Sequence, residues 1–324
     1  MKPSPLPPEF SDVAFTVSEA HDAGLRPRRL RAADLRTPHH GVRAPADAVS
    51  ASLEARCGDL LPRLEPLHIY AGPTALALWG APLPGWTERY LHVGALLGVR
   101  EPRIPGVVGH RFAFLPEDAT LLRGLPVPPP AEAWAQSADR CGSPNPERGR
   151  YERSRRPPDP LKRRFLTVDE LTAAADYLLT DGLADREELV RVAEVARRRG
   201  AVALREAAEF ARAGSESPKE SELRLLVVRG GSPEPELNWN LTDASSALVA
   251  RLDLAYPQYR VAVEYDGRHH AEASQFSRDA DRWAAIADHD WILIRAVAHD
   301  LADEPRRLLR RIERALRSRG WPDD

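Results

Sequence analysis

The chain has 324 residues, enough for about two to three domains with a sizeable apolar core. It is 43% hydrophobic and 29% charged, a composition typical of a water-soluble globular protein. The formal net charge of −2 excludes an overall basic field that would attract nucleic acid, so any such surface must be local. Basic charge is almost all arginine, which indicates the codon bias of a GC-rich genome rather than a nucleic-acid-binding class of protein.

The sequence also bears on the compartment. No run approaches the roughly 18 apolar residues of a membrane span, and the N-terminal MKPSPLPPEF lacks the apolar core of a signal peptide. Cys57 and Cys141 are far apart and provide no disulfide framework, which fits a reducing environment. We therefore expect a cytoplasmic protein with no membrane partner.

Residues 12–45 show the pattern of a partial winged-helix or helix-turn-helix unit. A short helix over 19–23 ends at Gly24, a typical C′ glycine, and a second helix begins at Pro27. The segment 40–43 suits a strand or wing that follows the second helix. The predicted DNA-contacting residues on that helix are Arg28, Arg29 and Arg31, and solvated surface arginines are the alternative.

The middle of the chain changes character three times. Residues 136–165 combine prolines, glycines and many arginines, which predicts a flexible solvated insertion. The alternative is a nucleic-acid-binding arm. Thr167 and Glu170 then form a capping box that opens a run of helices. The predicted regions are a mixed α+β segment at 46–135, a flexible basic insertion at 136–165 and a helical connector at 166–214.

Residues 215–320 predict a further domain of alternating helix and strand. Ser217 caps its first helix, and Glu220 lies in the first turn. Glu220 is four residues before Arg224, a spacing that favours an ion pair. The elements that follow are predicted as strands at Glu236–Leu241, Leu248–Ala255 and Arg260–Asp266, a helix near 275–289, a strand at Trp291–Val297 and an amphipathic, arginine-rich helix at Glu304–Ser318.

The second and third of these strands carry a group of acids. Strand side chains alternate between faces, so Glu264 and Asp266 share one face of the third strand. If the two strands pair about the turn at Pro257, Asp253 approaches this pair. Gathered carboxylates repel one another unless they are compensated, and a hard divalent cation with oxygen ligands is the usual compensation. The sequence therefore predicts an Mg²⁺ (or Mn²⁺) site with Asp253 and Glu264 as ligands.

A histidine follows the acids closely. Gly267 allows a sharp turn, so His270 can fold back and act as a general acid or base beside a metal-activated water. The alternative for the whole group is a set of exposed acids at the edge of a sheet. In that case we expect them to pair with the neighbouring arginines Arg251, Arg260 and Arg268.

Four motifs in this region point to a known family. RLDLAYP, VEYDG with a following histidine, SRDADRW and DWILIRA resemble a domain of uncharacterised function related to very-short-patch-repair endonucleases, within the PD-(D/E)XK nuclease-like superfamily. The resemblance covers about residues 217–318. It implies an αβββαβ restriction-endonuclease-like core in which Asp253 and Glu264 occupy the acidic positions and Glu220 is the acid of the leading helix.

The resemblance also shows one departure and three further matches. Asp266 stands where many members have a lysine, and an aspartate cannot orient water or offset charge as the lysine does. Asp279, Arg282 and Arg295 match family positions. They are expected either to support the metal ligands or contact phosphate, or to form simple ion pairs. Arg295, the predicted nucleic-acid-binding residue of this region, and the arginines of 306–317 are expected to steer the phosphate backbone.

The N-terminal motifs point to a second family. SEAHDAGLRPRRLRAADL, HGVR and GPTALALWGAPLP followed by LHV resemble the N-terminal half of the antitoxins of abortive-infection toxin–antitoxin systems, which act as transcriptional regulators. This resemblance covers about residues 12–135. It implies DNA, and a cognate toxin or other protein, as partners.

These observations predict an α/β protein, α+β overall, with a regulator-like N-terminal region and a C-terminal nuclease-like core. The leading hypothesis is a bacterial metal-dependent endonuclease that hydrolyses DNA phosphodiesters. The rivals are a non-catalytic DNA-binding regulator or antitoxin and an assembly module that recruits a separate nuclease or toxin. The predicted catalytic residues are Glu220, Asp253, Glu264, Asp266 and His270.

Overall fold

The computed structural model describes residues 3–46, 52–96, 98–112, 119–139, 165–196, 200–267 and 273–322, without the side chains of 273–279. Helices and strands are mixed throughout, which confirms the predicted α+β content. Of the helices in these ranges, none has the length and apolar character needed to cross a bilayer. The chain forms two compact units, one of Met1–Leu166 with Val192–Ala201 and the other of Thr167–Arg191 with Val202–Asp324.

The first unit begins with a small antiparallel sheet and a short helix. Thr16 caps the helix and forms a capping box with Glu19, because each side chain accepts a hydrogen bond from the other residue's backbone N–H. Phe10, Phe15 and Leu30 are buried in its core. In sheet order the strands are β1 (Phe15–Thr16), β3 (Val42–Pro45) and β2 (Leu35–Arg36), and the helix is α1 (Val17–Asp22).

The second helix predicted after Pro27 is absent from this part of the structure. Arg29–Arg31 form only a 3₁₀ turn, and Leu35 belongs to β2, which pairs with β3. Tertiary pairing outweighs local helix propensity here, as is common for short segments. The predicted glycine end of the first helix is correct, since Gly24 has a φ of +81°.

The remainder of the first unit holds a second three-stranded sheet. Its strand order is β4 (His68–Tyr70), β5 (Leu91–Ala95) and β6 (Val107–Arg111), antiparallel and then parallel. The hairpin of β7 (Thr120–Leu122) and β8 (Leu125–Val127) and the helices α2 (Leu53–Leu60), α3 (Gly72–Leu78) and α4 (Pro130–Ser137) complete it. The predicted insertion at 136–165 lies largely outside the described residues.

Three helices occupy most of the predicted connector. They are α5 (Val168–Thr180), α6 (Arg186–Val195) and α7 (Ala201–Phe210). The predicted capping box at the start of α5 is present, with Thr167 and Glu170 bonded reciprocally. Residues 167–191 and 202–214 cluster with the C-terminal region, so α5 is part of the second unit.

The second unit is built on a four-stranded sheet in the order β12-β11-β10-β9. β9, β10 and β11 are antiparallel neighbours, whereas β12 is parallel to β11. The elements, in chain order, are α8 (Pro218–Arg229), β9 (Glu236–Thr242), β10 (Leu248–Tyr256), β11 (Val261–Tyr265), α9 (Ala273–Asp288), β12 (Ile292–Ala296), α10 (Ala298–Ala302) and α11 (Pro305–Ser318). The predicted elements are confirmed to within a few residues at each boundary, and the short helix α10 is an addition that was not predicted.

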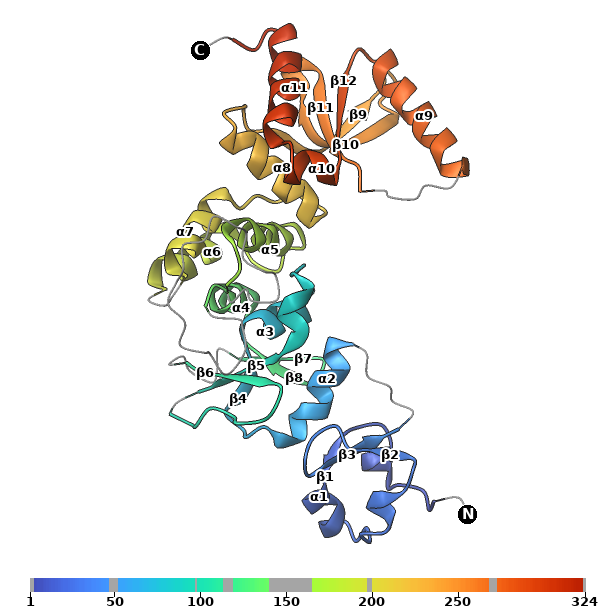
Figure 1. Cartoon of the computed structure of the whole chain (residues 1–324), viewed down its shortest axis with the longest axis vertical. Coiled ribbons are helices and arrows are strands. Elements are labelled where there is room, and N and C mark those ends of the chain that lie inside the picture. Colours follow the sequence, from blue (N-terminus) through green and yellow to red (C-terminus); the bar gives the residue numbers. More distant parts are fainter. Residues whose placement is uncertain are drawn as a thin grey trace. The chain divides into compact units, whose positions relative to one another are not determined.

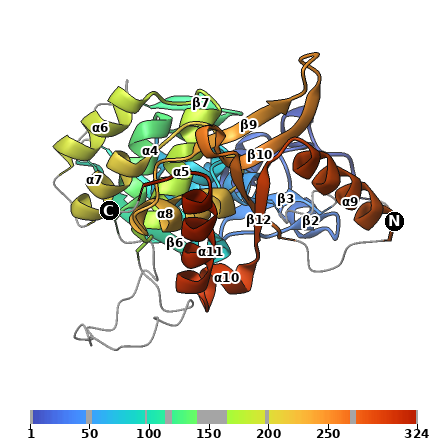
Figure 2. The ribbon, with the colours of Figure 1, turned by 90° about the horizontal axis from the view of Figure 1, so that it is seen from above.

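Helices cover both faces of this sheet. Val261 and Val263 of β11 pack with apolar residues of α8 and α11 on one face. Ala262 packs on the other face with Ile286 of α9. Figures 1 and 2 show β12 between α9 and α11. The alternation along β11 therefore directs Glu264 to the face that carries α9.

Candidate functional site

The acids of the central strands meet on the α9 face near the end of β11. β10 and β11 pair with Leu254 opposite Val263, so Asp253 and Glu264 are the next residues along the two strands. The Asp253 Oδ2 atom accepts a hydrogen bond of 3.0 Å from the backbone N–H of Tyr265. The strand pairing thus brings together two residues that are eleven positions apart in the sequence.

The carboxyl group of Asp253 has a raised pKa. Burial raises the pKa of its carboxyl group to about 7, and the Tyr265 N–H opposes that change. The negative charges of Glu264 and Glu220 raise the pKa further, whereas Arg282 lowers it. Three acids are therefore close enough to interact electrostatically, and one of them exchanges its proton near neutral pH.

Glu264 is bound to an arginine of the covering helix. Both carboxylate oxygens accept from the Arg282 guanidinium, one at 2.9 Å, and Glu264 is only 7% exposed. Arg282 also donates to the Arg251 carbonyl at 2.7 Å. A bidentate pair of this kind is both strong and geometrically specific.

Asp266 has an equivalent partner on the next strand. The Arg295 guanidinium donates to its carboxylate, and the Asp266 side chain is 9% exposed. The same guanidinium lies 3.8 Å from the ring centroid of Trp283. Arg282 and Arg295, expected either to contact phosphate or to form ion pairs, thus form ion pairs with the two strand acids.

Glu220 reaches the site from the start of α8. One of its carboxylate oxygens accepts from Ser217 Oγ at 2.8 Å, and the other accepts from the backbone N–H of Glu216 at 2.9 Å. Asn238 of β9 donates to Glu220 as well, at 3.2 Å. The capping contacts hold this carboxylate at the helix N-terminus, where the helix dipole favours a negative charge.

Some expected members of the site are outside the described residues, and others have different partners. His270 and Arg268 fall outside the described residues, as does the side chain of Asp279. Arg251 pairs with Glu216 at 2.5 Å, and Arg260 pairs with Asp290 at 3.1 Å. Neither of these two arginines is the described partner of a strand acid.

The described donor set does not fit Mg²⁺ as it stands. Mg²⁺ requires several oxygen ligands in a near-octahedral arrangement. Both oxygens of Glu264 are engaged by Arg282, so a cation there would compete with a bidentate guanidinium. Over the ranges that the structure describes, no three His, Cys, Asp or Glu side chains are grouped to hold a metal ion.

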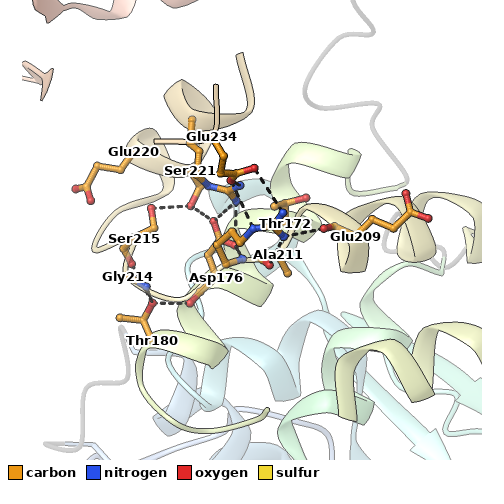
Figure 3. Close-up of polar contacts among 12 residues, drawn as sticks. Thr172, Asp176, Thr180, Glu209, Ala211, Gly214, Ser215, Glu220, Ser221 and Glu234 are labelled. Carbon is orange, nitrogen blue, oxygen red and sulfur yellow. Dashed lines mark hydrogen bonds and ion pairs between the residues drawn. The ribbon is translucent and has the colours of Figure 1, made fainter. Parts of the chain in front are cut away.

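A second polar centre in this unit was not predicted from the sequence. Asp176 of α5 and Arg224 of α8 are both fully buried and form an ion pair at 2.9 Å. Asp176 also accepts from Ser221 Oγ and from the backbone N–H of Arg212, each at 2.7 Å (Figure 3). Arg224 therefore binds a residue of another helix rather than Glu220, four positions away.

This centre extends to the start of α8. Ser221 Oγ lies 2.9 Å from Ser215 Oγ, and Arg224 also contacts Glu234 at 3.3 Å (Figure 3). Burial raises the pKa of Asp176, and the charge of Arg224 opposes that change. The contacts attach α5 to the helix that carries Glu220. An arginine on the apolar side of a predicted helix is the only sequence signal for them.

The three N-terminal arginines have different environments. Arg29 is 8% exposed and forms a bidentate pair with Asp34, with distances of 2.8 and 2.9 Å. Arg28 and Arg31 are exposed. Of the three N-terminal arginines, Arg28 and Arg31 are therefore the ones accessible to a partner.

Comparisons with known proteins give limited information. No family model matches the chain, and no solved structure matches it. Two uncharacterized proteins from strains of Mycobacterium tuberculosis, Rv2248 and MT2308, are each 38% identical over 146 residues, which is 44% of this chain and 54% of the relative. The chain therefore spans about half the length of the curated relatives it matches, and their names state no activity.

Proposed function

We propose that the second unit is a nuclease-like domain that hydrolyses DNA phosphodiesters with Mg²⁺ or Mn²⁺ as its cofactor. The observation that carries the proposal is that Asp253 accepts a hydrogen bond from the backbone of β11 and lies within reach of the negative charges of both Glu264 and Glu220. Like charges at such a position destabilise a fold, so a role in binding or catalysis explains their presence better than stability does.

The order of elements supports the same proposal. α8, β9 to β11, α9 and β12 follow the αβββαβ order that the resemblance to very-short-patch-repair endonucleases implies. Asp253 and Glu264 occupy adjacent strands, as the acidic positions of that family would. The proposed roles are metal binding for Asp253 and Glu264 and acid–base chemistry for His270.

One observation favours a second candidate, a non-catalytic DNA-binding regulator or antitoxin. Glu264 and Asp266 are both paired with arginines, and such pairs neutralise the acids without a metal ion. In this alternative the acids of the nuclease-like fold are occupied by arginines and the domain has only a structural role. DNA would contact Arg28 and Arg31 in the first unit. A cognate toxin is the protein partner proposed for this alternative.

Cleavage of DNA by the full chain separates the two candidates. Supercoiled and linear duplex DNA are incubated with the protein in EDTA and across a range of MgCl₂ or MnCl₂. We expect metal-dependent cleavage that falls at least about 100-fold in Asp253→Asn and in Glu264→Gln, since each removes a proposed ligand. Asp281→Asn, an exposed acid of α9, is the matched control and should cleave as the parent chain does.

Each other result has a definite meaning. Cleavage that is unchanged in both variants would show that these acids are not the site. If neither metal supports cleavage of any substrate, the hydrolase proposal fails. Loss of DNA affinity in an Arg28→Glu/Arg31→Glu variant would then support the regulator.

A further inference from the structure

The last long helix of the second unit has an unusual charge. Although the whole chain has a net charge of −2, the 14 residues of α11 contain six arginines and a single acid, Glu313. Leu308, Ile312 and Leu316 are fully buried against the sheet. The helix therefore has one apolar side that is used inside the fold and a basic side that faces outward.

The arginines of this helix fall into two groups. Arg307 pairs with Glu304 at 2.7 Å, Arg311 with Asp300 at 3.8 Å, and Arg317 with Glu313 at 2.8 Å. The other three are exposed, and within the described residues no acid pairs with them. These three form the outer arginine row: Arg306, Arg310 and Arg314.

The geometry of the outer arginine row suits a repeating anion. Its members are four residues apart, so they follow one another along the outward side of α11 at about 6 Å per step. A DNA strand carries one phosphate per ~3.4 Å of axis, so consecutive arginines can meet alternate phosphates. Guanidinium groups also match phosphate oxygens in a bidentate geometry.

The helix also passes close to the acidic site. Arg311 donates to the Arg295 carbonyl at 3.3 Å, and Arg295 pairs with Asp266. α11 therefore runs past the end of β12 that lies next to the strand acids, on the opposite face from α9 (Figures 1 and 2).

We propose that the outer arginine row of α11, Arg306, Arg310 and Arg314, binds the phosphate backbone of duplex DNA on the face of the sheet opposite the acids. This inference depends on the proposed function for the identity of its partner. An anionic membrane is disfavoured because insertion needs an exposed apolar side, and the apolar side of α11 is buried.

The salt dependence of DNA binding tests this surface. Anisotropy of a labelled short duplex is measured in EDTA over a range of salt, for the full chain and for Arg310→Gln/Arg314→Gln. Each lost phosphate contact lowers the magnitude of the slope of log K against log salt by about 0.9, so the double variant should lose about 1.8. Arg191→Gln/Arg205→Gln removes the same charge from exposed helical positions of the same unit and should keep the parent slope.

Three results would overturn the proposal. The first is an unchanged slope in Arg310→Gln/Arg314→Gln, and the second is an equal loss of slope in the Arg191→Gln/Arg205→Gln control. The third is that Arg310→Gln/Arg314→Gln loses binding to vesicles of anionic phospholipid while its DNA slope stays the same. Circular dichroism checks that both variants remain folded. DNA binding is measured in EDTA, which prevents metal-dependent cleavage, so the binding and cleavage assays are independent. A reduced slope in Arg310→Gln/Arg314→Gln, together with no cleavage by the parent chain in the metal assay, would support this DNA-binding surface and reject the hydrolase proposal. Metal-dependent cleavage by the parent chain, together with an unchanged slope in the variant, would support the hydrolase proposal and reject the DNA-binding surface.

Discussion

Two carboxylates of the second unit, the fully buried Asp176 and the half-buried Asp253, have different surroundings. Asp176 accepts from Arg224, from Ser221 and from a backbone N–H, so its negative charge is compensated on several sides. Asp253 accepts from one backbone N–H and lies close to the negative charges of Glu264 and Glu220. Burial raises the pKa of both groups, but only Asp253 has acids as neighbours.

The difference separates a structural centre from a candidate functional one. A buried charge with complete hydrogen bonding fixes the packing of the elements that supply its partners. A buried acid that faces other acids adds little to stability and is more often retained for chemistry or binding. The comparison therefore marks Asp176 as the residue that joins α5 to α8 and Asp253 as the candidate functional residue.

The largest expected effect comes from the structural centre. Arg224→Leu leaves Asp176 buried without its counter-charge, and we expect the free energy of unfolding to fall by about 3–5 kcal/mol. Urea unfolding of the full chain measures the change. Arg229→Leu is the matched control on the same helix, because Arg229 pairs with Asp169 of α5 at the surface and should cost less than about 1 kcal/mol. Equal losses in the two variants would show that the buried pair is not special.

A smaller effect is expected at Asp253, and it depends on pH. The pKa of Asp253 is about 7 in the folded state, whereas its ordinary value is 3.8. The protonated carboxyl group therefore contributes its full stabilisation of the fold at a pH below 3.8. That stability is lost as the pH rises through about 7. Asp253→Asn keeps a neutral acceptor for the Tyr265 N–H. The free energy of unfolding of the variant, relative to that of the parent chain, should therefore increase between pH 4 and 7, by on the order of 1–2 kcal/mol after allowance for solvent screening.

The measurement is a series of urea unfolding curves across this pH range. Asp281→Asn, at an exposed position of α9, controls for the loss of one acid from the unit. If the stability difference between Asp253→Asn and the parent is constant with pH, folding does not raise the pKa of Asp253. The comparison with Asp176 would then no longer distinguish the two centres.

The framework of the second unit was predictable because its signals are local. Ser217 and Pro218 mark the start of α8, and alternating apolar residues mark β10 and β11. The close approach of Asp253 to the acids of β11 also followed from alternation and one tight turn. In contrast, the segment after Pro27 has helix-forming residues but pairs as a strand, because β3 offers a partner that local propensity does not include.

The ion pairs were not predictable in the same way. Spacing along a helix pointed Arg224 to Glu220, but the residue it contacts is Asp176, 48 positions away. Arg282 and Arg295 reach strand acids that are 18 and 29 positions away. Periodicity along one element cannot specify which side chain of another element will face it, so these contacts depend on the packed structure.

The smallest expected effect tests whether Glu220 belongs to the acidic site. Glu220→Gln removes one of the negative charges that raise the pKa of Asp253 and keeps an acceptor for the Glu216 N–H, so the pKa of Asp253 should fall. The shift appears as a lower midpoint in the pH profile of stability relative to the same variant with Asp253→Asn. Glu222→Gln removes the same charge from α8 and should leave the midpoint in place, because Glu222 pairs with Lys219. Identical midpoints in the two variants would separate Glu220 from the strand acids and reduce the proposed site to Asp253 and Glu264.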